Sequence, residues 1–278
     1  MKPFPILMLA GLILGYSYCS GLPDRTYEPP VGMISVTNLD PLYSSYTNLL
    51  TDYVENGNVD YAGMCKDPRL EKVMQGFRSV DTTTIETREQ GLAFWINAYN
   101  AFTLDLICLG YPVESINDLH GAGGLYTSTA LGQTIWKIHK FPVGNNQYTL
   151  DGIEHQILRP DYNDYRIHAG IVCASVSCPL LLTEAFTPER IDEQLDEQLK
   201  EFLASEIRNR IDPKTRTIYL SRIFKWFEKD FTGGKTPLIN VLWKYFPFSW
   251  QESMESPENA LRSWDVQYLD YDWSLNGK

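Results

Sequence analysis

The sequence has little positive charge and nowhere concentrates it. Its 278 residues include 24 Lys and Arg against 35 Asp and Glu, which gives a formal net charge of −11. No run of five like charges occurs anywhere in the chain. Because binding to a phosphate backbone relies on clustered basic side chains, we do not expect nucleic acid to be a partner.

The sequence also lacks internal repeats, low-complexity runs and any long linker rich in Pro, Gly and Ser. We therefore expect a single domain over residues 33–278, and a hydrophobic content of 44% is ample for its core. Helical patterns alternate irregularly with a few strand patterns. This mixture predicts an α+β fold with a buried central helix, several amphipathic helices and a small sheet.

The N-terminus has the features of an export signal. Lys2 precedes a short apolar stretch, which predicts a signal peptide over residues 1–19, followed by a linker over residues 20–32. Cys19 stands where a bacterial lipoprotein carries its lipidated thiol, whereas the bulky Tyr18 favours ordinary cleavage, so both alternatives stay open. With no later membrane-spanning segment identified, we expect a protein of the periplasm or outer membrane, lipid-anchored or soluble.

Residues 88–109, REQGLAFWINAYNAFTLDLICL, predict a helix that is apolar nearly all round and therefore buried. Gln90, Asn97 and Asn100 fall on one stripe of this helix. A buried amide without a partner costs about 1–3 kcal/mol, so the stripe must meet polar groups. These amides either hold the backbone of a neighbouring loop or line a site, and we expect the stripe to meet the helix that carries His155.

A second, shorter helix is predicted in YTLDGIEHQILRP, capped by Thr149 or Asp151 and limited by Pro160. His155 and Arg159 are four residues apart and share a face of this helix. Glu154 points about 100° away from His155, so each is expected to find a partner elsewhere.

The stretch RIHAGIVCASVSCPLL begins with an alternation typical of a strand over residues 167–173. A strand would place Cys173 in the core and His168 on the opposite face. Cys178 follows a loop of small residues, 174–177, and can turn toward a cleft with His168 or His155. In that loop the backbone donors beside Ser177 would serve a bound carbonyl or an oxyanion.

The cysteines leave several alternatives open. Cys173 and Cys178 could form a disulfide, and Cys65 and Cys108 have the surroundings of small buried hydrophobes. No CxxC or HExxH spacing is present, so we expect neither a metal site nor another cofactor. We expect His120 and His139, beside Gly and Pro, to be ordinary surface histidines.

Six blocks in order resemble the family called domain of unknown function 547, in the form of an exported bacterial member: VDYAGM, LAFWINAYNAFTLDLI, LDGIEHQILR, RIHAGIVCASVSCPLL, LSRIFKWFEKDF and YLDYDWSLN. The family's name assigns no reaction. The resemblance implies a portable domain whose common polar set is Asn97, Asn100, Glu154, His155 and Arg159. It places His168 and Cys178 in the bacterial version of the family.

A thiol nucleophile needs a base within reach and a group that orients the base. We expect Cys178, or else Cys173, as nucleophile and His155 or His168 as base. Asn97, Asn100 or Glu154 would orient the base, Gln90 would donate to an oxyanion, and Arg159 and Ser177 would help to bind substrate. The hypothesis is a thiol-dependent hydrolase or acyltransferase acting on a peptide-like or cell-envelope substrate. The alternative is a non-catalytic module of the envelope that binds a ligand or a protein.

Overall fold

The computed structural model describes Tyr27, residues 32–120 and residues 134–278. The expected signal peptide, with Cys19, lies outside the described residues. So does the expected linker, except for Tyr27 and Gly32. The predictions of export and of a lipid anchor at Cys19 therefore stay predictions.

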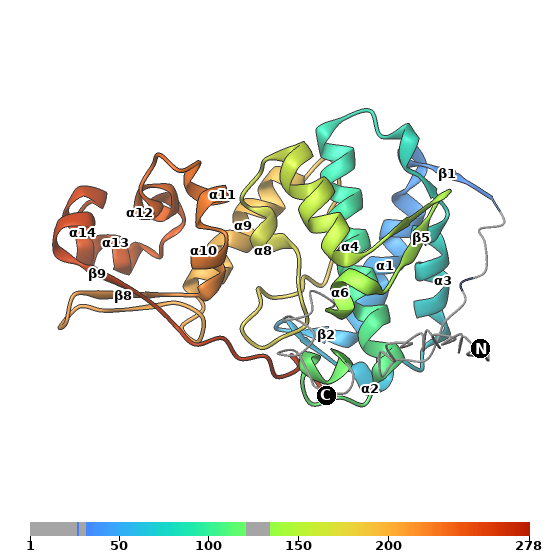
Figure 1. Ribbon diagram of the computed structural model, residues 1–278, viewed down its shortest axis with the longest axis horizontal. Coiled ribbons are helices and arrows are strands. Elements are labelled where there is room, and N and C mark those ends of the chain that lie inside the picture. The colour runs from blue at the N-terminus through green and yellow to red at the C-terminus, as the bar shows by residue number, and fades with distance from the viewer. Residues whose placement is uncertain (1–26, 28–31, 121–133) are drawn as a thin grey trace, which may run out of the picture.

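Helices make up most of the described chain (Figure 1). The α-helices are α1 (Asp40–Tyr53), α2 (Tyr61–Met64), α3 (Pro68–Arg78), α4 (Arg88–Gly110), α6 (Ile135–Ile138), α7 (Leu150–Gly152), α8 (Ile167–Gly170), α9 (Ile191–Ala204), α10 (Arg222–Trp226), α11 (Glu228–Thr232), α12 (Leu238–Leu242), α13 (Phe248–Met254) and α14 (Pro257–Ser263). Short 3-10 helices are η1 (Val36–Asn38), η2 (Thr82–Thr84), η3 (Ile116–His120) and η5 (Trp243–Tyr245), and η4 (Ile153–Tyr162) is a π-helix.

The strands form small separate sheets. Parallel β1 (Ile34–Ser35) and β4 (Val80–Asp81) make one sheet, and two hairpins pair β2 (Val54–Glu55) with β3 (Asn58–Val59) and β5 (Phe141–Val143) with β6 (Asn146–Tyr148). In the fourth sheet β8 (Thr217–Leu220) lies between β7 (Arg210–Asp212) and β9 (Asp265–Tyr268). The α+β class is confirmed, with four small sheets among the described residues in place of the one predicted.

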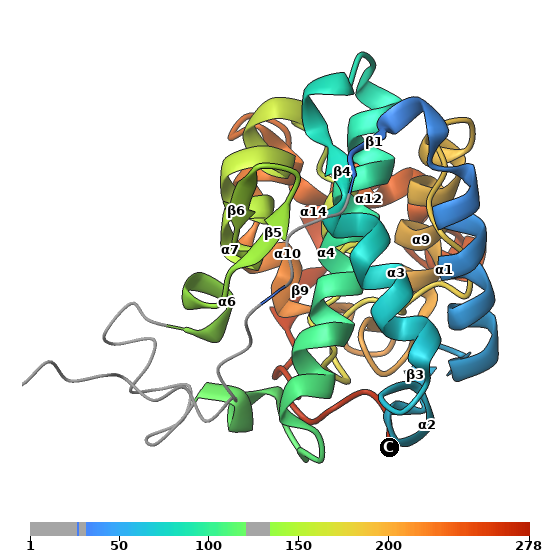
Figure 2. The same ribbon diagram turned by 90° about the vertical axis from the view of Figure 1, so that its right-hand side faces the viewer.

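The central helix is α4, as the sequence predicted. Thr87 and Gln90 form a capping box at its start, and every residue from Gly91 to Ile107 is buried. Figure 2 shows α4 in the middle, with α1 and α3 on one side and β5 and β6 on the other. The helix is long and apolar enough to cross a membrane, but 89% of its most apolar window is buried within the protein, as in the core helix of a globular fold.

The hydrophobic core has two clusters that meet at α9. The larger cluster surrounds α4, and the smaller is built from α10–α14 and β8, at the left of Figure 1. Ile191 and Leu195 of α9 belong to the larger cluster, whereas Leu199 and Phe202 belong to the smaller one. One amphipathic helix thus joins both parts of the core.

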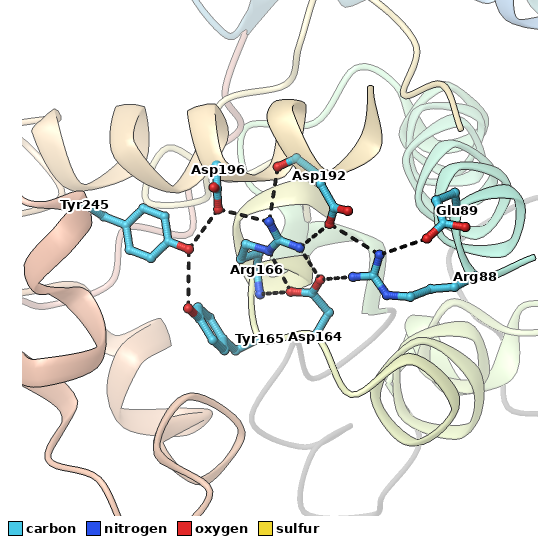
Figure 3. A network of polar contacts seen from close by, with 8 residues as sticks. All are labelled: Arg88, Glu89, Asp164, Tyr165, Arg166, Asp192, Asp196 and Tyr245. Carbon is cyan, nitrogen blue, oxygen red and sulfur yellow. Dashed lines mark hydrogen bonds and ion pairs between the residues drawn. The ribbon is translucent and has the colours of Figure 1, made fainter. Parts of the chain in front are cut away.

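A network of ion pairs fixes the segment that precedes α8 (Figure 3). Arg166 donates to Asp164 through two nitrogens and also reaches Asp192 and Asp196 on α9. Asp196 in turn accepts from Tyr245 of η5, which belongs to the smaller core cluster. Because Arg166 and Asp164 are largely buried and bonded at both ends, the network holds α8 against α9 more firmly than exposed pairs would.

Residues 167–173 are not the strand that the sequence predicted. They form the helical turn α8, closed by the Ile171 N–H donating to the Ile167 carbonyl, followed by an irregular segment. The side chain of Asn100 binds this segment, since its Nδ2 donates to the Gly170 carbonyl and its Oδ1 accepts from the Val172 N–H, both at 2.9 Å. A side chain of α4 therefore satisfies the backbone groups that a neighbouring strand would have paired.

Cys65 and Cys108 form a disulfide between the end of α2 and the last turns of α4. The interpretation of these two residues as small buried hydrophobes was therefore wrong. Both cysteines also pack against the larger core cluster, so they contribute to the core as well as forming the disulfide.

Candidate functional site

A cavity of about 260 Å³ opens between the two core clusters. Its wall is mainly aromatic and apolar, with a small polar set. The lining residues are Tyr99, Ile116, Asn117, His120, Thr134, Trp136, Glu154, His168, Ile171, Cys173, Cys178, Ile223, Trp226, Phe227, Tyr271 and Trp273. Such a wall, with a few convergent polar groups, is typical of a small-molecule or substrate site.

The two thiols lie side by side in this cavity and are both free. Their sulfurs are 2.7 Å apart, compared with about 2.05 Å for a disulfide bond. The hydroxyl groups of Ser175 and Tyr271 lie 3.1 and 3.3 Å from Cys173 Sγ. The Cys173 N–H donates to Cys178 Sγ at 2.8 Å. Cys173 Sγ thus lies within hydrogen-bonding distance of one thiol and two hydroxyl groups.

The C-terminal segment of the chain holds the turn between the thiols. Figure 1 shows this segment running back from β9 across the molecule to the C-terminus. The N–H groups of Val176 and Ser177 donate to carbonyls of residues 274 and 272, and the Asn276 N–H donates to the Ala174 carbonyl. Ala174 itself has a φ of +63°, which costs about 1 kcal/mol or more for a residue with a Cβ. Strain of this kind often marks a functional turn.

The surroundings shift the pKa values of the two thiols in opposite directions. The hydrogen bond from Cys178 is the main cause that lowers the pKa of the Cys173 thiol to about 6, with help from Ser175 and Tyr271. Burial raises the pKa of Cys178 well above its usual range, and the hydrogen bond to Cys173 and its negative charge raise it further. Cys178 is only 3% exposed, whereas Cys173 is half-buried. This is the reverse of the predicted arrangement, because that arrangement rested on a strand that does not form.

Glu154 brings a carboxyl group to the same cavity from η4. Burial raises the pKa of Glu154 to about 7, and the negative charge of Cys173 adds to the rise, while the cation of Arg159 opposes it. The helix that carries Glu154 continues through Pro160 to Tyr162 instead of ending before the proline. It does so as a π-helix, a form that is frequent at functional sites.

His168 lies in the cavity wall but is bonded away from the thiols. Its ring stacks on Phe227 at 3.9 Å, and its Nε2–H donates to Asp230 at 2.9 Å. Asp230 also accepts two bonds from Arg159, which donates to His155 Nδ1 at 2.8 Å. Burial lowers the pKa of both histidines. Within the described part of the chain, no hydrogen bond joins either imidazole to a thiol.

The other predicted site residues lie outside the cavity lining. Gln90 caps α4, with its Oε1 accepting from the N–H groups of Glu86 and Thr87, so it is no oxyanion donor in this cavity. Asn97 holds the Phe186 backbone through two bonds of 2.7 and 2.9 Å. With Asn100 it fulfils the structural alternative, in which the amides hold loops, and the stripe does not bond to His155. Ser177 accepts from the Asp272 N–H, so it also serves the turn.

Several residues of the site were missed in the sequence. Ser175 and Tyr271 complete the Cys173 environment, and Asp230 fixes His168. The block YLDYDWSLN marked the region of Tyr271 without giving it a role. His120, expected at the surface, is buried and stacks on Trp136 at 5.4 Å.

None of the His, Cys, Asp and Glu side chains of the described residues form a group of three or more placed to hold a metal ion. From its own side chains the cavity offers a thiol with a pKa lowered to about 6 and a carboxyl group with a pKa raised to about 7.

One of the comparisons with known proteins gives a match. The model of the family described as "Protein of unknown function, DUF547" matches residues 83–203, which include α4, Glu154 and both thiols. Tyr271, Asp230 and the tryptophans at positions 226 and 273 come from outside the matched segment. No curated protein and no solved structure matches the chain. Residues 83–203, the segment that carries the central helix and the thiol pair, are a DUF547 domain.

Proposed function

We propose that this protein is a thiol-dependent hydrolase or acyltransferase in which the Cys173 thiolate is the nucleophile. One observation carries the proposal: at the wall of an open cavity, Cys173 Sγ lies within hydrogen-bonding distance of the Cys178 thiol and of the Ser175 and Tyr271 hydroxyl groups. A thiol pKa of about 6 leaves roughly nine tenths of Cys173 as thiolate at pH 7. The thiolate, not the thiol, attacks a carbonyl carbon.

Glu154 supplies the proton transfers. With a pKa of about 7, its carboxyl group is close to half protonated at neutral pH, where a general acid and base works best. In the first step the bond from sulfur to the carbonyl carbon forms, and the leaving amine departs with the Glu154 proton. In the second step water or an acceptor amine gives a proton to the Glu154 carboxylate and attacks the thioester, which releases Cys173 as thiolate.

His168 completes the polar wall. Because its Nε2–H donates to Asp230 and burial keeps the ring neutral, its Nδ1 carries no proton. Asp230 orients the imidazole, as the aspartate of a hydrolytic triad does. Unlike the histidine of such a triad, His168 has no hydrogen bond to the nucleophile among the described residues. We assign His168 a positioning role toward the substrate.

The aromatic wall points to an acyl group with an apolar body. Trp136, Trp226 and Trp273 line the cavity with Tyr99 and Phe227, and the Trp226 and Trp273 rings stack at 5.8 Å. Peptide-like envelope compounds with apolar side chains fit this wall. The signal-like N-terminus and the Cys65–Cys108 disulfide support a place in the periplasm or on the outer membrane, lipid-anchored or soluble.

A binding module without chemistry is the second candidate. The observation that favours it is the lack of a bond between the thiols and either imidazole within the described residues. In this alternative the aromatic wall retains a ligand, and the thiol pair only shapes the floor of the cavity.

Activated esters separate the two candidates. The protein is mixed with a p-nitrophenyl ester of an apolar acid, release of p-nitrophenol is followed, and the acyl adduct is mapped by mass spectrometry. The proposal predicts an adduct on Cys173, lost in Cys173→Ser and kept in Cys178→Ser. Glu154→Gln should still be acylated, since p-nitrophenolate leaves without a proton, but should release the acyl group more slowly.

A folded protein that forms no adduct at Cys173 would contradict the proposal and favour the binding module. An adduct that persists unchanged in Cys173→Ser would show reaction at another residue and would also contradict it.

A further inference from the structure

The short distance between the Cys173 and Cys178 sulfurs is the basis for a second reaction. We infer that Cys173 and Cys178 form a dithiol–disulfide couple that exchanges electrons with low-molecular-weight disulfides. The sulfurs need to approach by only about 0.7 Å, from 2.7 Å to a bonded separation of about 2.05 Å. This activity shares with the proposed function only the nucleophilic Cys173, and it needs no acyl substrate.

Backbone hydrogen bonds hold the turn of residues 174–178 and keep the two thiols close together. The Cys178 N–H donates to the Ser175 carbonyl at 3.0 Å, and the C-terminal segment fixes Ala174, Val176 and Ser177 by backbone hydrogen bonds. Ser175 is completely buried beneath the pair. Since both ends of the turn are already held, closing the disulfide orders little additional chain.

The two cysteines also differ in the way that an attacking and a resolving thiol differ. Cys173 is half-buried in the cavity wall and is mainly thiolate, whereas Cys178 is buried and protonated. An external disulfide can therefore reach Cys173 first. The order of attack follows from burial and charge together.

The exchange balances in two steps. In the first, Cys173 Sγ bonds to one sulfur of the external disulfide, whose sulfur–sulfur bond breaks and releases one thiolate. In the second, Cys178 loses its proton and its Sγ bonds to Cys173 Sγ, which releases the other external sulfur as a second thiolate. The pair gives up two electrons and the Cys178 proton, and the external disulfide becomes two thiols by taking up that proton and one from solvent.

The first step prepares the second. The negative charge on Cys173 is one of the causes that keep the pKa of Cys178 high, and the mixed disulfide removes that charge. The Arg208 guanidinium, whose Nε donates to the Cys178 carbonyl at 2.6 Å, then attracts the negative charge of the newly formed Cys178 thiolate. Resolution is thereby favoured over accumulation of the mixed disulfide.

Oxidised glutathione is the probe. The full chain is reduced, equilibrated at a series of ratios of reduced to oxidised glutathione, quenched in acid, alkylated under denaturing conditions and mapped by peptide mass. We expect Cys173 and Cys178 to lose their reactive thiols together, in a peptide lighter by the two thiol hydrogens. The Cys65–Cys108 bond is mapped separately in the same digest.

Two variants test the order of attack. Cys178→Ser should accumulate a glutathione adduct on Cys173. In Cys173→Ser, Cys178 should react roughly a hundredfold more slowly than Cys173 does in the unaltered protein, as its small thiolate fraction requires. The inference is overturned if the unaltered protein stops at an adduct on Cys173, or if both thiols stay free at every ratio. Acylation of Cys173 by the ester probe is read separately, so either reaction can fail while the other stands.

Discussion

Replacing Cys178 by alanine should raise the pKa of the Cys173 thiol and slow its alkylation at neutral pH. The contact of 2.7 Å between the two sulfurs is the main cause of the low Cys173 pKa, and alanine removes it. A hydrogen bond to a charged group contributes about 1.5–3 kcal/mol, and one pKa unit corresponds to about 1.4 kcal/mol. The pKa of Cys173 should therefore rise from about 6 to between about 7 and 8.

The rise in the Cys173 pKa lowers the rate of alkylation at neutral pH. At pH 7 the thiolate fraction falls from about nine tenths to between about one half and one tenth, so alkylation by iodoacetamide slows by about two- to tenfold. The assay measures the rate of Cys173 modification from pH 5 to pH 9 by peptide mass, with circular dichroism as a check of folding. Cys178→Ser is the matched control, because its hydroxyl group still donates and should shift the midpoint less.

Tyr271→Phe extends the series. The Tyr271 hydroxyl lies 3.3 Å from Cys173 Sγ, a longer contact than that of Cys178, so its removal should raise the midpoint by less than Cys178→Ala does. If the midpoint of Cys173 stays at its original value in Cys178→Ala while the protein remains folded, hydrogen bonding does not hold the thiolate, and the reasoning is refuted.

The remaining predictions concern stability. Asn97→Ala should destabilise the protein by about 2–5 kcal/mol in urea unfolding, because it leaves both backbone groups of buried Phe186 without partners; a loss below 1 kcal/mol would count against this role. Because the pKa of Glu154 is raised in the folded protein, its protonated carboxyl group contributes stability fully below about pH 4.5, and this contribution is lost as the pH rises to about 7. Glutamine does not ionise, so the stability of Glu154→Gln relative to the unaltered protein should increase by about 3 kcal/mol between pH 4 and pH 8. A parallel pH dependence of the two proteins would show that Glu154 is not buried as described. Replacing Cys65 and Cys108 together by serine should cost about 4 kcal/mol, from the loop of 43 residues that the disulfide closes, and an unchanged Tm would mean that the bond is absent.

The sequence predicted those elements whose determinants are local. The helix from Arg88 was recognisable because its apolar residues surround the whole helix and because Gly110 stands at its end. The cap at Thr149 was recognisable for the same reason, since it depends on neighbouring residues alone.

The segment at residues 167–173 could not be assigned in this way. A short apolar run fits a strand or a buried helical turn equally well, and the choice here depends on Asn100, about 70 residues earlier in the chain. Cysteine spacing likewise gives no connectivity, so the Cys65–Cys108 bond was not predictable from the chain.

The sequence predicted part of the cavity lining but not the contacts within it. Glu154, His168 and both thiols do share one cavity. Their pKa values, however, depend on contacts from distant segments: Tyr271 is 98 residues from Cys173, and Asp230 is 62 residues from His168. No periodicity or spacing rule brings such residues together, and only the folded chain shows that the pKa is lowered at Cys173 and raised at Cys178.

The most direct test of the central claim is the titration of the two thiols by NMR in reduced protein labelled with ¹³C at the cysteine Cβ. The claim is that Cys173 is a thiolate at neutral pH. It predicts that the Cβ signal of Cys173, assigned with Cys173→Ser, titrates with a midpoint of about 6, while the signal of Cys178 does not move below pH 9. A Cys173 signal that titrates near 8.5 or above, the range of an ordinary thiol, would contradict the account.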